Sequence, residues 1–243
     1  MKSPKIQFLA TAMLLATTIF ITSCGKDAEP TPAVVTFAKV MLVHAGFALP
    51  AVDFYIDGIK KNTDSLVYSK NTLYFDVEAG KSHSLAVKRA GTNTLVVDSS
   101  SVNLNTDIAL TLIAYRDSAG KPLVQKLTDD LTPTSVDSAK IRFGNFSLNS
   151  VGNSIDFEAV LPGGIGVANK NLFSNVLFGL TTDFARILKG TYDFKLKNKG
   201  TSNLGITIGT SGKILEAGKI YTVLAIGDVA KANQSTIMIV TNK

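Results

Sequence analysis

Apolar and polar residues alternate along much of this chain with the two-residue period of β-strands. Residues 51–56 (AVDFYI) place apolar side chains on one face, and the Asp57-Gly58 pair after them is typical of a tight turn. Residues 108–115 and 220–226 are β-branched and almost continuously apolar, which predicts central strands buried on both sides. Short strands at intervals of about 8 to 12 residues predict an all-β fold of immunoglobulin-like, Greek-key β-sandwiches.

This pattern occurs twice along the chain, at an offset of about one hundred residues. The matching pairs of segments are 38–44 with 139–145, 52–54 with 155–157, 68–80 with 178–190, and 111–114 with 222–225. We therefore predict two tandem sandwich domains, at residues 37–127 and 139–243. A polar linker broken by Pro133 is expected between them at residues 128–138.

Residues 1–23 resemble the signal peptide of a bacterial lipoprotein. Two lysines precede a short apolar run, and Ile21-Thr22-Ser23-Cys24 resembles the lipobox at which such signals are cut. The thiol of Cys24, the single cysteine of the chain, would then carry a diacylglycerol and its amine a further acyl chain such as palmitate. Because each buried methylene contributes about 0.8 kcal/mol, several acyl chains hold a protein durably on a membrane. We expect a lipidated tether at residues 24–36.

Charged residues follow directly after this cysteine. Lys26, Asp27 and Glu29 resemble the short export signal that sends some lipoproteins of the Bacteroidota to the outer face of the outer membrane. The resemblance implies a protein of the outer membrane, anchored by lipid at Cys24 and facing the cell exterior. A charged, solvated tether is the alternative, and it leaves the periplasmic face open.

Several segments of the first copy carry a family resemblance. Residues 38–45 (AKVMLVHA), 50–58 (PAVDFYIDG) and 78–80 (EAG) resemble the domain of unknown function 4397. The second copy is similar from residue 139 to about residue 242. It replaces the His44-Ala45 pair with Asn145-Phe146, and Tyr55 with Glu158. The resemblance implies an exported or cell-surface bacterial protein and no established activity.

The chain offers little of the residue chemistry that catalysis needs. It has no Gly-x-Ser-x-Gly nucleophile motif, and its two histidines, His44 and His83, both lie in the first copy. A metal site would have to borrow Asp53 or Asp57, so we predict a partly buried structural imidazole for His44 and an exposed one for His83. Asp53 and Asp156 occupy equivalent strand positions, where a carboxylate that caps backbone amides is the simpler interpretation. No enzyme activity, metal or cofactor is expected.

The charge of the chain is +6, from 25 basic and 19 acidic residues, and it is spread without a basic block. In the densest basic stretch, residues 189–199, lysines alternate with other residues as on the solvated face of a strand, so nucleic acid is not an expected partner. The Gly-Lys pairs that begin at residues 80, 120 and 218 predict three turns with glycine at positive φ.

Candidate binding residues fall in two groups. The tyrosines Tyr55, Tyr68, Tyr74 and Tyr115 have faces that could stack on sugar rings, although the chain has no tryptophan. Residues 161–175 form the main insertion in the second copy, and a longer loop that carries binding is predicted there. Its candidate contact residues are Leu161, Pro162, Gly163, Gly164, Asn169 and Asn171. Leu172, Val176 and Leu180 have helical spacing, which Gly179 weakens.

Taken together, the sequence favours a non-catalytic envelope lipoprotein, an interaction or adhesion-type module that binds a protein or glycan partner. Two alternatives stay open: a metal-dependent or hydrolytic envelope enzyme, and a structural spacer. Three tripeptides resemble an O-glycosylation motif used by the Bacteroidota, and they are centred on Ser65, Ser118 and Ser138.

Overall fold

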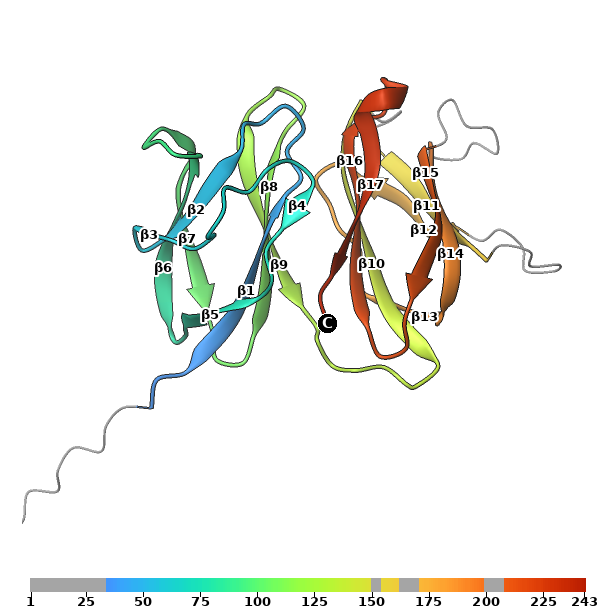
Figure 1. Ribbon diagram of the computed structural model, residues 1–243, viewed down its shortest axis with the longest axis horizontal. Helices are drawn as coiled ribbons and strands as arrows, with labels where there is room; N and C mark the ends of the chain where they lie inside the picture. Colours follow the sequence, from blue (N-terminus) through green and yellow to red (C-terminus); the bar gives the residue numbers. More distant parts are fainter. Residues whose placement is uncertain (1–33, 150–153, 162–170, 199–207) are drawn as a thin grey trace, which may run out of the picture. The chain divides into compact units, whose positions relative to one another are not determined.

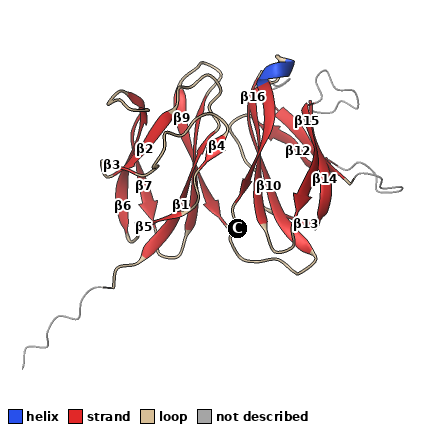
Figure 2. Ribbon diagram, viewed as in Figure 1, coloured by secondary structure: helices blue, strands red, loops and turns tan. Residues whose placement is uncertain are grey.

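The computed structural model describes residues 34–149, 154–161, 171–198 and 208–243. Within these ranges the chain consists almost entirely of strands and turns, with one short 3-10 helix, η2 (Ala232–Gln234) (Figure 2). None of the helical structure in the described ranges is long and apolar enough to cross a membrane. The predicted all-β sandwich fold is confirmed.

The first sandwich consists of two sheets (Figure 1). Sheet A has the strand order β4-β1-β8-β9, with β5 also paired to β1, and sheet B has the order β3-β2-β6-β7. Strand β1 runs parallel to β8, whereas its partners β4 and β5 are antiparallel to it. The strands are β1 (Phe37–His44), β2 (Val52–Ile56), β3 (Ile59–Lys60), β4 (Lys70–Asn71), β5 (Phe75–Glu78), β6 (Lys81–Arg89), β7 (Leu95–Leu104), β8 (Ala109–Arg116) and β9 (Pro122–Asp129).

The second sandwich consists of two further sheets. Sheet C has the order β13-β10-β16-β17, and sheet D has the order β12-β11-β14-β15. Strand β10 runs parallel to β16, as β1 does to β8. The strands are β10 (Ser138–Leu148), β11 (Ser154–Val160), β12 (Asn171–Leu177), β13 (Ala185–Leu188), β14 (Gly190–Asn198), β15 (Ile208–Leu215), β16 (Ile220–Asp228) and β17 (Ser235–Thr241).

Corresponding strands keep the same register in the two sandwiches. Met41 lies opposite Thr111 in the parallel pair of sheet A, and Arg142 lies opposite Thr222 in the parallel pair of sheet C. In the sequence repeat, Met41 is equivalent to Arg142 and Thr111 is equivalent to Thr222. Positions that correspond in the sequence repeat therefore also correspond in the two sandwiches.

Each sandwich has its own apolar core, and a third cluster lies between sheets A and C. Alternate residues of β1 divide between them, since Val40 and Leu42 pack in the first core while Met41 and Val43 pack in the third cluster. We call this third group the central cluster. It contains Met41, Val43, Ala45, Ile113, Leu127, Phe146, Leu224, Ile226, Met238 and Val240, with Tyr68, Tyr74 and Tyr115 packed against them.

The central cluster explains why some strands are apolar on both faces. Residues 109–114 and 220–226 are buried along their whole length, as predicted, because each has one sandwich core on one side and the central cluster on the other. In β14 (Gly190–Asn198) the predicted alternation is also present, with Phe194 and Leu196 buried and Lys195 and Lys197 partly exposed.

The predicted turns are present. Asp57 and Gly58 both have positive φ, at 50° and 75°, as a two-residue hairpin turn requires. Glycines 80, 120 and 218 have φ values of 82°, 88° and 75°, which confirms the three Gly-Lys turns.

Two segment boundaries differ from the sequence prediction. Residues 171–175 form part of β12 and not of a loop. The helix suggested by the spacing of Leu172, Val176 and Leu180 is absent, because β12 pairs with β11 through an irregular register. Strand β9 continues to Asp129, two residues into the expected linker, because Asp129 pairs with Ala109 of β8.

Candidate functional site

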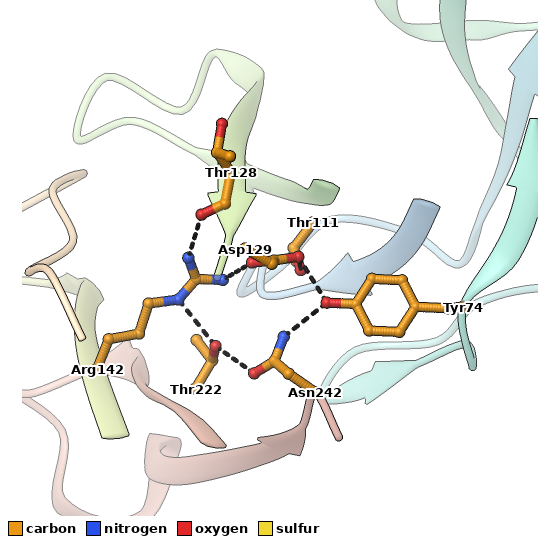
Figure 3. A network of polar contacts seen from close by, with 7 residues as sticks. All are labelled: Tyr74, Thr111, Thr128, Asp129, Arg142, Thr222 and Asn242. Carbon is orange, nitrogen blue, oxygen red and sulfur yellow. Dashed lines mark hydrogen bonds and ion pairs between the residues drawn. The ribbon is translucent and has the colours of Figure 1, made fainter. Parts of the chain in front are cut away.

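A buried network of seven polar residues lies between sheets A and C, beside the central cluster (Figure 3). Its centre is the carboxylate of Asp129, at the end of β9. One oxygen, Oδ2, accepts hydrogen bonds from the hydroxyls of Thr111 and Tyr74, each at 2.6 Å. The other oxygen, Oδ1, is paired with the guanidinium of Arg142 on β10. The network therefore joins the end of the first sandwich to the start of the second.

Arg142 is almost completely buried, with 4% of its side chain exposed, and the carboxyl group of Asp129 has no exposed surface. The guanidinium also donates to the Thr128 carbonyl at 3.1 Å and to the Thr222 hydroxyl at 2.9 Å, and it lies 4.5 Å from the centre of the Phe184 ring. Removing both charges from water costs several kcal/mol per ion, and a pair of this kind is tolerated when its remaining donors and acceptors are satisfied.

Tyr74 and Asn242 close the network. The amide of Asn242 donates to the Tyr74 hydroxyl at 3.0 Å and accepts from the Thr222 hydroxyl at 2.7 Å. Burial raises the pKa of Tyr74, and the neighbouring carboxylate of Asp129 raises it further, so the phenol stays protonated and acts as a donor. Each of these groups is hydrogen-bonded within the network, so the network holds the sandwiches together.

Two clefts flank the network. The large cleft encloses about 1030 Å³ and is lined by the ends of β1, β5 and β8, by residues 129–133, and by Asn242 and Lys243. An apolar strip runs along it, and its members are Phe37, Ile108, Ala109, Leu131 and Pro133. The small cleft, of about 530 Å³, lies between residues 126–130 and the segment 181–184, with Arg142 in its wall.

Charged side chains around the large cleft cancel in pairs. At the rim the ammonium of Lys39 lies 3.2 Å from the carboxylate of Asp76. Asp130 is paired with Lys140, and this hydrogen bond holds the pKa of Asp130 at about 2, so that its carboxylate is ionised. Three charged side chains at the lining remain: Asp129, which is paired with Arg142, and Asp107 and Lys243, which have opposite signs. The cleft therefore presents both donors and acceptors without a net charge.

Both histidines have structural contacts. His44 is fully buried; its Nε2 donates to the Pro50 carbonyl at 2.9 Å and its Nδ1 accepts from the Gly46 amide. Burial lowers the pKa of His44, which favours this neutral form. In the second sandwich Asn145 takes over the same role, since its side-chain oxygen accepts from the Ser147 amide. The substitution of asparagine for histidine thus preserves the local hydrogen bond.

The prediction of an exposed His83 is wrong. Only 3% of this residue is exposed, because its ring lies between the Asp57 turn and the end of β5. Its Nδ1 lies 2.6 Å from Asp57 Oδ2 and its Nε2 lies 2.8 Å from the Glu78 carbonyl oxygen. Within the described ranges, no group of three or more metal-ligating side chains is assembled.

Asp53 and Asp156 each accept a hydrogen bond from a backbone amide, as the sequence suggested. The amide of Gly91 donates to Asp53 at 3.1 Å, and that of Asn175 donates to Asp156 at 2.7 Å. Asp53 also pairs with Lys60 at 2.9 Å. These contacts give both carboxylates a structural role in the outer sheets.

The position occupied by Tyr55 and Glu158 shows how the two sandwiches diverge. In sheet B the ammonium of Lys88 lies 4.4 Å from the centre of the Tyr55 ring. In sheet D the equivalent Lys197 forms an ion pair with Glu158. A lysine is thus matched by an aromatic ring in one sandwich and by a carboxylate in the other.

Three of the four tyrosines proposed for sugar stacking, Tyr68, Tyr74 and Tyr115, pack in the central cluster. Tyr115 packs edge-on against Phe146, with ring centres 4.9 Å apart. Tyr55 lies in sheet B, away from these three. The four rings therefore do not form one platform.

Several predicted site residues lie outside the described ranges. These are the residues of the lipobox and export signal, including Cys24, Lys26, Asp27 and Glu29, and the loop residues Pro162, Gly163, Gly164 and Asn169. Of the remaining loop candidates, Leu161 packs against the second core and Asn171 is the first residue of β12. Ser65 and Ser118 are exposed, whereas Ser138 is buried at the start of β10.

The Asp129–Arg142 pair was not predicted from the sequence. One signal was available, since Arg142 interrupts an apolar strand at the position where the first copy has Met41. A charged residue within an apolar strand requires a buried partner of opposite charge when both faces of that strand are buried. The partner itself could not be identified, because it lies in the segment assigned to the linker.

The fold and the clefts define an all-β sandwich protein with a polar network between its two sandwiches. Residues 38–156 match the model of the family described as Domain of unknown function (DUF4397). This match covers the first sandwich and continues through β10 into β11, and it confirms the predicted family resemblance for that part of the chain. No curated protein matches the chain.

Among solved structures, the chain is similar to CBMbc (family CBM26) from Eubacterium rectale Amy13K in complex with maltoheptaose. The identity is 9%, 82% of this chain and 95% of that chain are covered, and the TM-score is 0.27. A second similar structure concerns alpha-glucan binding by a streptococcal virulence factor, with 8% identity, the same coverages and a TM-score of 0.25. Likenesses at these TM-scores carry no argument about fold or ligand.

Proposed function

We propose that this chain is a non-catalytic lipoprotein of the bacterial cell envelope that binds an uncharged glycan in the large cleft. The observation that carries the proposal is the lining of that cleft, where an apolar strip with the half-exposed ring of Phe37 lies beside charged groups that cancel in pairs. A protein partner is the second candidate and is an outcome of the test below.

The chemistry of the lining suits hydroxyl-rich, uncharged ligands. Sugar hydroxyls both donate and accept hydrogen bonds, and Lys39, Asp76, Asp107 and Lys243 offer both kinds of partner at the cleft. The C–H face of a sugar ring can pack on an aromatic ring such as that of Phe37. The volume of about 1030 Å³ is at the upper end of the range of about 300 to 1,000 Å³ found for small-molecule sites. An ionic ligand would find no net charge to select it.

The absence of catalysis is part of this proposal. Three groups of the polar network beside the cleft, the carboxylate of Asp129, the phenol of Tyr74 and the guanidinium of Arg142, are committed to one another by hydrogen bonds. A general acid must give a proton to a substrate and a general base must take one from it, and these groups could do neither without breaking the contact between the sandwiches.

The proposed location rests on the sequence alone. We propose that Cys24 carries the lipid and that Lys26, Asp27 and Glu29 direct export to the outer face of the outer membrane. We also propose that the second sandwich is a further copy of the same domain family, because its strand order and register repeat those of the first.

Binding is tested with the mature chain without its lipid on an array of neutral and charged glycans, followed by titration calorimetry of each hit. Phe37→Ala should weaken binding at least tenfold. The matched control is Leu73→Ala, which removes another exposed apolar side chain (83% exposed) that does not line either cleft. Equal losses in both variants, or capture of protein ligands alone, would overturn the glycan assignment. Appearance of shortened glycan products would overturn the non-catalytic assignment.

A further inference from the structure

The faces of sheets A and C that meet in the central cluster are built from equivalent positions. Ile113 and Leu224 are equivalent, since they lie opposite Val43 and Gly144 in the two parallel strand pairs. Leu127 and Val240 are likewise equivalent, since they lie opposite Thr111 and Thr222. All four residues belong to the central cluster. The first sandwich thus contacts the second with the same face that the second offers in return.

The polar network follows the same rule. Thr111 donates to Asp129 at 2.6 Å, and the equivalent Thr222 donates to Asn242 at 2.7 Å. Asp129 and Asn242 are themselves equivalent, because each lies two residues beyond the paired residues Leu127 and Val240.

The two clefts repeat this relation. Tyr74 and Asn242 line the large cleft, and the equivalent residues Phe184 and Asp129 line the small one, although Asp129 also lines the large cleft. Each cleft thus combines an aromatic residue of one sandwich with the strand end of the other. In a two-fold interface, residue i contacts residue j and residue j contacts residue i, and the lining of the two clefts follows this reciprocal arrangement.

We infer that the two sandwiches meet through a self-complementary, two-fold surface. This surface fits a second copy of this chain as well as it fits the other sandwich of the same chain. One charge pair selects which sandwich is bound. The pair is Arg142 with Asp129. By the two-fold relation, the other half of the interface places Met41 against Asn242, so only one of the two equivalent positions holds an ion pair.

The charge pair makes the choice of partner specific. If two first sandwiches met, each Asp129 would face a methionine and be buried without a cation. If two second sandwiches met, each Arg142 would face an asparagine and be buried without an anion. A buried charge without its partner is strongly unfavourable, so only the pairing of a first with a second sandwich satisfies both charges. The short linker adds a high effective concentration, which favours the sandwich of the same chain.

The first test adds the second ion pair within one chain. Met41→Arg and Asn242→Asp each bury a new unpaired charge, whereas the double variant places the two charges at the vacant equivalent position. We expect the urea midpoint of the double variant to lie above the midpoints of both single variants. If the urea midpoint of the double variant lies at or below the midpoint of the less stable single variant, the two-fold relation is wrong.

The second test exchanges sandwiches between chains. The variant Arg142→Met/Asn242→Asp carries aspartate on both faces, and the variant Met41→Arg/Asp129→Asn carries arginine on both faces. Each alone buries two unpaired charges, but a mixture satisfies every charge between the two chains. We expect sedimentation to show a 1:1 heterodimer after the two variants are refolded together, with a higher urea midpoint than either alone.

The matched control for the exchange replaces Met41→Arg with Val43→Arg, which puts the same charge in the same cluster at a position without an equivalent carboxylate. This control should give no heterodimer. A heterodimer in the control as well, or its absence from the main mixture, would overturn the inference. Because refolding the mixture also provides a partner for variants that do not fold alone, failure of either single variant to fold does not mask the result.

Discussion

Replacing Arg142 with methionine, the residue found at the equivalent position 41, should destabilise the folded chain by about 3 to 5 kcal/mol. The carboxyl group of Asp129 has no exposed surface, so without the guanidinium its Oδ1 is buried with no cation. The Thr128 carbonyl and the Thr222 hydroxyl lose a donor at the same time. For a folded unit of about 200 residues, each kcal/mol lowers Tm by about 2 to 4 °C, so the expected fall is about 6 to 20 °C.

Urea denaturation followed by far-ultraviolet circular dichroism measures this loss, with the free energy of unfolding obtained by linear extrapolation. Adding Asp129→Asn to Arg142→Met should recover much of the loss, because neither charge is then buried. The control is Lys39→Met, which breaks the exposed pair with Asp76 and should cost less than about 1 kcal/mol. A loss below about 1 kcal/mol for Arg142→Met, or a double variant no more stable than the single one, would refute the reasoning.

Three further predictions concern other parts of the chain. Cys24→Ala should move the protein from the membrane fraction to the aqueous phase of a detergent partition; unchanged membrane retention would contradict lipidation of Cys24. The hydrogen bond from His83, with a further one from a backbone amide, lowers the pKa of Asp57. The contribution of Asp57 to stability is therefore complete above the unfolded pKa of about 4 and is lost as the pH falls through the folded pKa. During acid titration, Asp57→Asn should lose less stability below pH 4 than the parent, and parallel curves would exclude a contribution from Asp57. Gly227→Ala should destabilise by more than about 2 kcal/mol, because φ is +106° and a Cβ would lie 1.9 Å from the carbonyl oxygen of Gln234; thermal melting at an unchanged temperature would show that the strand backbone relaxes.

Local features were predictable from the sequence because they depend on neighbouring residues. The Asp57-Gly58 turn requires positive φ at two successive positions, and this pair of residues tolerates it. The strand at 220–226 was recognised from its β-branched, apolar run. The backbone capping by Asp53 and Asp156 was predicted from their equivalent strand positions, although the amides that they accept from belong to residues 38 and 19 positions away in the sequence.

The candidate site was predicted less well. Tyr74 was identified as a candidate, but as a surface ring for stacking, whereas its hydroxyl is part of a buried network. His83 was assigned to the surface because no local pattern shows that its strand packs beneath the Asp57 turn. Each error concerns which surfaces of the chain come to lie against one another, and that information is spread over segments far apart in the sequence.

The amino-acid sequence by itself determined the strands, the turns and the repeated pattern, since each depends on the alternation of faces and on the φ values that particular residues allow. The tertiary structure decided that sheets A and C are covered by each other, and this turned the apolar outer faces of β1, β8, β10 and β16 into a shared cluster. It also brought Arg142 and Asp129 together. The physical reason is that burial of a charge or an apolar face depends on the surface that meets it, and that surface is chosen only when the two sandwiches pack.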